Sequence, residues 1–242
     1  MSSESNFDSI IYIPIGMDCS VAYNLQKIGL RRMALPFDWL RINNIQTIVS
    51  LLESRFQFFL DKEYFEEDSK SDSSKFPVIS DYDLDDSDGL DDSDGSDVLD
   101  TIDTMDTMDT TETSKHTIIT NTKLNIKFYH DFRTVEDTNT VIEKYNRRIN
   151  RLYSILDDSS VTKVFVRLSR NAKDNIIFKK FIKKMEWKNC EMIHILLTKM
   201  NMMAKMTEMT AMAQINIVAD TSFGNWKKEE LDWTNLLNID KV

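Results

Sequence analysis

Apolar residues recur along this chain with two different spacings, and each change of spacing marks the end of a predicted element. Alternating or continuous runs of Ile, Val, Leu and Phe indicate strands, whereas apolar residues three and four positions apart indicate helices. Because strands and helices alternate, the pattern predicts an α/β fold, a mostly parallel sheet flanked by helices in a three-layer sandwich. Strands are expected at 10–15, 117–120, 124–129, 161–168, 191–197 and 215–219, and helices at 19–28, 45–56, 135–156, 174–185 and 226–237.

A long polar stretch interrupts this alternation. It is rich in Asp, Ser, Gly and Thr, and it holds 14 acidic residues and no Lys or Arg between Asp81 and Glu112. Such a composition buries too little apolar surface to offset the entropy of ordering, so we expect a disordered acidic insert, apart from a short strand near 76–79. The predicted organisation is a disordered N-terminus at 1–9, one α/β domain formed by 10–65 and 115–242, and the insert at 66–114.

The charge of the chain is divided unevenly. The formal net charge is −10, and because the acidic stretch holds 14 carboxylates, the remainder carries about +4. We therefore expect the acidic insert to contact basic surfaces. A Met-rich segment at 200–212 suits either an adaptable binding face or an ordinary helix stripe. No apolar run is long enough to span a bilayer, so we do not expect a membrane as partner. We also do not expect a specific nucleic acid as partner.

Cys19 stands where the first predicted strand gives way to a helix. The strand ends near Gly16, and helical spacing begins at Cys19. A thiol in the first turn of a helix lies near unpaired N–H groups and the positive end of the helix dipole, which favour the thiolate. The same N–H groups could stabilise an oxyanion. Cys19 is therefore the predicted nucleophile, whereas Cys190 precedes a strand and is expected only to pack.

A cysteine nucleophile needs a base, and the chain has three histidines. His130 follows the strand at 124–129, so it falls at a carboxyl strand end, as Cys19 does. His116 borders the acidic insert, and His194 lies among apolar residues within a strand. We therefore predict His130 as the general base, with a strand-capping role as the alternative, and His194 as a core residue.

An acid that orients the base is expected among the loop aspartates. Asp38 and Asp220 are preferred, and Asp131 ranks lower because strand alternation would turn it away from His130. The predicted catalytic residues are thus Cys19, His130, Asp38 and Asp220. The predicted substrate-binding residues are Gly16, Asp18, Trp39, Arg31 and Arg167; for both arginines a structural ion pair is the alternative.

Several motifs together resemble a known family. They are Gly16-x-x-Cys19, Gly29-Leu30-Arg31, Pro36-Phe37-Asp38-Trp39, Phe128-Tyr-His130-Asp131-Phe132, Tyr145-Asn-Arg147-Arg148-Ile149-Asn-Arg151 and Val164-Phe165-Val166-Arg167. Together they resemble the family named “putative papain-like cysteine peptidase”. A papain-like fold would place the cysteine helix before an antiparallel barrel-like sheet. The alternation of strands and helices instead favours a flavodoxin-like or esterase-like sandwich.

These observations predict a cysteine-dependent hydrolase that acts on a peptide or another acyl compound through a thioester. Two alternatives remain: a non-catalytic interaction module that uses the acidic insert and the Met-rich segment, and an esterase-like hydrolase. Neither a cofactor nor a metal is expected, since no His or Cys pair has ligand spacing. Two cysteines make no disulfide framework, which favours the cytoplasm. The bias toward Asp, Asn, Ile and Lys suits an AT-rich genome, such as that of a large DNA virus or a protist, so the cytoplasm would be a host cell's if the source is viral.

Overall fold

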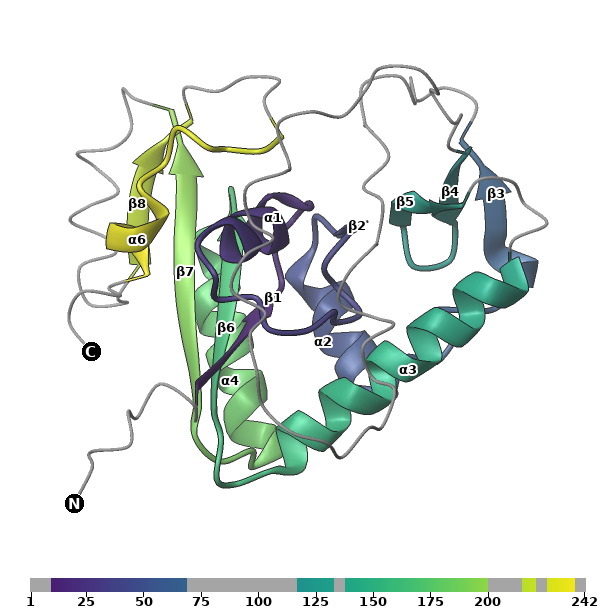
Figure 1. Cartoon of the computed structure of the whole chain (residues 1–242), viewed down its shortest axis with the longest axis horizontal. Helices are drawn as coiled ribbons and strands as arrows, with labels where there is room; N and C mark the ends of the chain where they lie inside the picture. The colour runs from purple at the N-terminus through teal and green to yellow at the C-terminus, as the bar shows by residue number, and fades with distance from the viewer. Residues whose placement is uncertain (1–9, 69–116, 133–137, 200–214, 221–225, 238–242) are drawn as a thin grey trace, which may run out of the picture.

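The computed structural model describes residues 10–68, 117–132, 138–199, 215–220 and 226–237 (Figure 1). Its elements form two four-stranded sheets with helices packed around them. In chain order they are β1 (Ile10–Pro14), α1 (Ser20–Lys27), β2 (Leu40–Arg41), α2 (Ile45–Glu53), the 3-10 helix η2 (Lys62–Tyr64), β3 (Phe65–Glu67), β4 (Thr117–Asn121), β5 (Ile126–Phe132), α3 (Thr138–Asp157), β6 (Thr162–Ser169), α4 (Lys173–Met185), β7 (Cys190–Thr198), β8 (Ile215–Ala219) and α6 (Trp233–Leu236).

The first sheet is fully parallel, with strand order β1-β6-β7-β8. Alternate side chains of β6 enter two different cores. Val164, Val166 and Leu168 pack with residues of α1 and α6, whereas Phe165 packs with residues of α2 and α4. Burial on both faces explains the continuous apolar run of this strand. The predicted α/β fold with a parallel sheet flanked by helices is confirmed.

The second sheet is antiparallel, with strand order β2-β5-β4-β3. The predicted hairpin forms its centre, as β4 and β5. The strands β2 and β3 were not predicted, and β3 occupies 65–67, which overlaps the predicted start of the insert. Aromatic rings of β3, β5 and α3 fill the space beneath this sheet, as in the contact of Phe128 with Tyr145 at 5.5 Å between centroids.

Two helices are shorter than predicted. The helix expected at 45–56 ends at Glu53, because Arg55 and Phe56 adopt left-handed backbone angles. The tail helix expected at 226–237 is reduced to Trp233–Leu236. The predictions for 76–79 and 200–212, most of the acidic insert and His116 lie outside the described residues. None of the described helices is long and apolar enough to cross a membrane.

Candidate functional site

Cys19 lies at the carboxyl end of β1, immediately before α1. The turn between them requires glycine at position 16, because a Cβ there would lie 2.7 Å from Val21 Cγ2 and 2.9 Å from the Asp18 carbonyl oxygen. Met17 N donates to the Leu168 carbonyl at 3.0 Å, which anchors the turn to β6. Gly16 therefore serves close packing, and the thiol lies at the edge of the sheet where ligand sites of α/β proteins gather.

Asp18 acts as a cap of α1. Its Oδ1 accepts hydrogen bonds from Ser20 N at 3.1 Å and Ser20 Oγ at 2.5 Å. A carboxylate in this position stabilises the helix start. It therefore accepts a hydrogen bond from the Ser20 N–H, which is one of the backbone groups that the sequence suggested as oxyanion donors. The geometry thus gives Asp18 a structural function.

The surroundings of the Cys19 thiol favour its neutral form. Its residue is only 4 % exposed, and burial raises the pKa of the thiol well above its usual value. The charges of Asp18, Asp131 and Asp38 raise this pKa further, and a hydrogen bond from the Cys19 N–H only partly opposes them. The prediction that the helix start favours the thiolate was wrong, because desolvation and three carboxylates outweigh the dipole of a short helix.

An irregularity in β5 shapes the second half of the site. Thr117 pairs with Phe132 and Ile119 with Phe128, so the single residue between the two pairs on β4 lies opposite three residues of β5. The extra length falls within residues 129–131, where His130 lies. Such bulges bend a strand and redirect its side chains, and they are frequent beside active sites.

Trp226 connects His130 to the cysteine helix. The His130 ring lies 6.2 Å from the Trp226 ring, which in turn contacts the Tyr23 ring at 5.4 Å. Tyr23 is one helical turn after Cys19, and its N–H donates to the Cys19 carbonyl at 3.0 Å. Residues four apart share a helix face. The structure therefore brings the helix of Cys19 and the His130 ring against the same tryptophan.

Trp39 lies on another side of His130, with ring centroids 5.8 Å apart at an angle of 74°. Trp39 is buried, and the Arg31 guanidinium lies 5.2 Å from its ring centroid. Arg31 also donates to Asp38 Oδ2 from Nε at 2.8 Å and from Nη2 at 2.6 Å. Arg31 thus forms the structural ion pair that was its alternative role, and Trp39 forms a wall of the site.

The three aspartates considered as orienting acids differ in their partners. Asp38 Oδ1 is buried and accepts no hydrogen bond from any residue that the structure describes. Asp131 is bound by Lys144 at 2.7 Å and by the Tyr145 hydroxyl at 2.8 Å. Lys144, together with Arg148, keeps the pKa of Asp131 below its usual value despite burial. Asp38 Oδ1 is therefore available to accept a further hydrogen bond.

Asp220 belongs to a different group of charges. It follows β8, at the opposite edge of the parallel sheet from β1. Its carboxylate pairs with Arg170 at 2.6 Å and with Lys228 at 3.2 Å, and these cations keep its pKa low despite partial desolvation. The structure therefore places Asp220 in an ion-pair cluster with Arg170 and Lys228.

Arg167 is a buried connector between the two sheets. Its side chain is fully buried, its Nε pairs with Asp174 at 3.0 Å, and its Nη1 donates to the Ile15 carbonyl at 2.8 Å. Its Nη2 donates to the Asn43 carbonyl at 3.0 Å, just after β2. The guanidinium thus holds the strand before Cys19 and the segment after Trp39, and this geometry supports a positioning function and not substrate contact.

The two remaining predicted packing residues are in the parallel sheet. His194 is fully buried, and its Nε2 lies 3.0 Å from Ser169 Oγ. Burial and the charge of Arg167 lower the pKa of His194 to about 4. Cys190 begins β7, where partial burial raises the pKa of its thiol. Within the described residues, no group of three or more His, Cys, Asp or Glu side chains is placed to hold a metal ion.

Sequence reasoning missed three residues around the site: Arg41, Tyr129 and Trp226. Arg41 donates to the Tyr129 hydroxyl at 3.3 Å, and this bond, together with the charge of Asp18, raises the pKa of Arg41 despite partial desolvation. A cation thus lies near the thiol. The adjacency of Arg41 to the Pro36–Trp39 motif was the available signal, whereas nothing in the local pattern indicates Trp226.

The protonation state of Cys19 gives a testable pH dependence. We expect its alkylation by iodoacetamide to be more than about tenfold slower at neutral pH than in the urea-unfolded chain, since each pKa unit removes a factor of ten in thiolate. The rate should keep rising as the pH passes 9, because the thiolate forms only as the pH approaches the raised pKa. Peptide mapping by mass spectrometry measures the rate at Cys19 and Cys190 separately. A plateau already reached at neutral pH would contradict the protonated thiol.

Comparisons with known proteins identify the family of this chain. A family model described as “putative papain-like cysteine peptidase” matches residues 10–218. An uncharacterized protein of Acanthamoeba polyphaga mimivirus is 27% identical over 182 residues, which cover 69% of this chain and 68% of that protein. No solved structure matches.

Proposed function

Because this chain belongs to the family described as “putative papain-like cysteine peptidase”, we propose that it hydrolyses a peptide or related acyl compound through a thioester on Cys19. The observation that carries the proposal is the convergence of the Cys19 helix and the His130 ring on Trp226. A nucleophile and a base within reach of each other are the minimum that this chemistry requires.

In the proposed reaction, His130 removes the proton from the neutral Cys19 thiol as Sγ attacks the substrate carbonyl carbon. The tetrahedral intermediate collapses to a thioester, and the imidazolium gives its proton to the leaving amine. His130 then deprotonates a water that attacks the thioester, and it returns the proton to the thiolate. A general-base step suits this site better than a preformed ion pair, because burial and carboxylates disfavour the resting thiolate.

Three further groups support these steps. Asp38 has a buried carboxylate oxygen with no hydrogen bond from a described residue, and it adjoins Trp39, which contacts the His130 ring. We assign it the orientation of the imidazole. The Cys19 N–H and the Arg41 guanidinium are the groups near Sγ that would stabilise developing negative charge.

Trapping the acyl-enzyme tests the proposal. The protein is incubated with a panel of acyl-peptide aminocoumarin amides and with a nitrophenyl ester, quenched in acid and mapped by mass spectrometry. We expect an acyl adduct on the peptide that contains Cys19, unchanged in Cys190→Ala and absent in Cys19→Ala. Turnover that survives in Cys19→Ala would contradict the proposal, and turnover of the ester alone would favour the esterase-like alternative.

A non-catalytic interaction module is the second candidate, and the burial of the thiol favours it. Cys19 is only 4 % exposed, and no cation opposes the three carboxylates strongly enough to lower its pKa. If no substrate of the panel acylates Cys19, this candidate replaces the hydrolase.

The setting of the activity is also proposed. The similarity to a mimivirus protein supports a viral source, and a free, uncrosslinked thiol at the site suits a reducing compartment. We accordingly assign the activity to the cytoplasm of an infected host cell.

A further inference from the structure

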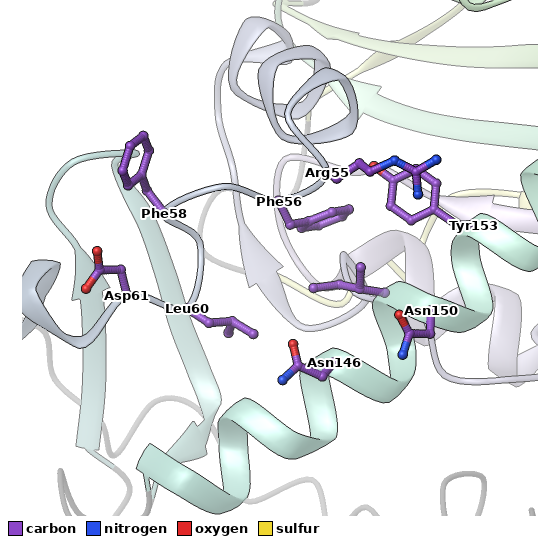
Figure 2. A pocket seen from close by; sticks show the side chains of 9 residues that line it. Arg55, Phe56, Phe58, Leu60, Asp61, Asn146, Asn150 and Tyr153 are labelled. Atoms are coloured by element: carbon purple, nitrogen blue, oxygen red, sulfur yellow. The ribbon is translucent and has the colours of Figure 1, made fainter.

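A pocket lies between α3 and the segment that follows α2. Figure 2 shows this pocket, which has a volume of about 420 Å³. Such a volume is within the range of pockets that hold small ligands or short chain segments. Neither Cys19 nor His130 lines it. The pocket is therefore a site separate from the proposed catalytic centre.

The wall that faces α3 has a strained backbone. Arg55, Phe56 and Phe58 have φ values of 51°, 61° and 63°, in the left-handed region that side chains other than glycine rarely adopt. This conformation turns Phe56 inward, where its ring contacts those of Phe37 and Tyr153 at 5.3 Å and 6.3 Å. It leaves Phe58 exposed at 37 %. Strain of this kind persists where the surrounding structure fixes it, and it is concentrated at binding sites.

Opposite charges stand at the two ends of the pocket. At one end the Arg55 guanidinium lies 4.6 Å from the Tyr153 ring centroid. At the other end is Asp61, whose carboxylate also accepts from Glu63 N at 3.1 Å (Figure 2). Between the charges the lining is apolar, with Phe56 and Leu60. The pocket thus suits a ligand that carries a negative group, an apolar centre and a positive group in that order.

Two asparagines form the polar wall on α3. Asn146 and Asn150 are exposed, and Figure 2 shows both on the side of α3 that borders the pocket. Four residues of helix rise by about 6 Å, which is close to the roughly 6.6 Å between alternate residues of an extended chain. Each carboxamide offers both a donor and an acceptor. The pair therefore matches alternate peptide groups of an extended segment.

We propose that this pocket binds an extended peptide segment, with an acidic side chain at Arg55 and a basic group at Asp61. An apolar side chain between them contacts Phe56 and Leu60, and the two asparagines pair with its backbone. The inference concerns binding and does not depend on hydrolysis at Cys19, so the two can fail independently.

The test uses full-length Cys19→Ala protein and two fluorescein-labelled pentapeptides, Lys-Ala-Leu-Ala-Glu and Lys-Ala-Leu-Ala-Gln. We expect saturable anisotropy for the acidic probe and about tenfold weaker binding of the Gln probe. Arg55→Gln should weaken binding of the acidic probe about tenfold and leave binding of the Gln probe unchanged. The substitution in the protein and the Gln in the probe remove the same contact, so their effects should not add. Asn146→Ala and Asn150→Ala should each weaken binding of both probes about fivefold.

Arg147→Gln is the matched control, since Arg147 is an exposed cation of α3 outside the pocket lining. It should leave both affinities unchanged, and thermal melts show whether each variant is folded. Equal losses of affinity for the acidic probe in Arg147→Gln and Arg55→Gln would show general charge attraction and overturn the proposal. Arg55→Gln that weakens binding of both probes equally, or anisotropy that saturates with neither probe, would overturn it too.

Discussion

His130→Gln is expected to lower kcat/KM for acylation of Cys19 by about 10²- to 10⁴-fold, the usual contribution of a general base. The effect should be large because the raised pKa keeps the resting thiol neutral, so the thiol must lose its proton as it attacks. Glutamine keeps much of the volume of the imidazole beside Trp39 and Trp226, so we expect the two tryptophans to stay in place. Acylation rates by rapid quench, with and without the substitution, measure the change.

The matched control is His194→Gln, which also removes a buried imidazole. His194 contacts Ser169 inside the parallel sheet, so its loss should reduce stability and leave kcat/KM unchanged below the melting temperature. Added imidazole should restore part of the rate to His130→Ala, because that variant opens space between two tryptophans. If His130→Gln retains full acylation while the protein is folded, His130 is not the base.

Arg167→Met is expected to lower the free energy of unfolding by about 3–5 kcal/mol, the usual result of removing one partner of a buried ion pair. The substitution leaves the Asp174 carboxylate buried without its cation, and it leaves the carbonyls of Ile15 and Asn43 without this donor. Urea unfolding followed by circular dichroism measures the loss. Replacing Asp174 by Leu in the same chain should recover part of it, since an apolar pair carries no desolvated charge.

Arg170→Gln provides the comparison three positions along the chain. Arg170 also pairs with an aspartate, but its side chain is 54% exposed, so its removal should cost about 1 kcal/mol or less. If Arg167→Met proves no more costly than Arg170→Gln, the buried network does not hold the two sheets together.

The parallel sheet was predictable because its strands are continuous apolar runs separated by helices with clear periodicity. The run at 161–168 became β6 with little change in its bounds. The strands β2 and β3 were not predictable, since two or three residues are too few to show alternation. The structure contains both a parallel and an antiparallel sheet, and the sequence predicted only the first together with a hairpin of the second.

For the candidate site, the sequence predicted the position of Cys19 better than its electrostatics. Local spacing placed Cys19 at the start of a helix, and the structure agrees. The raised pKa of the thiol was not predictable, because it depends first on burial and then also on Asp131 and Asp38, which come from distant parts of the chain. The bulge in β5 was equally hidden, since it is visible only in the pairing with β4.

Arg167 makes four hydrogen bonds, one of which is also its ion pair with Asp174, and these bonds restrict how the two sheets can move relative to each other. The proposed nucleophile follows a strand of one sheet and the proposed base lies on the other, and the Arg167 guanidinium links the two. Swinging the sheets apart would break these bonds and leave a buried cation without its partners, so we expect rigid-body opening to be unfavourable. We expect a substrate to reach the thiol through displacement of individual rings, and Trp226, which contacts both Tyr23 and His130, is the ring that we expect to move.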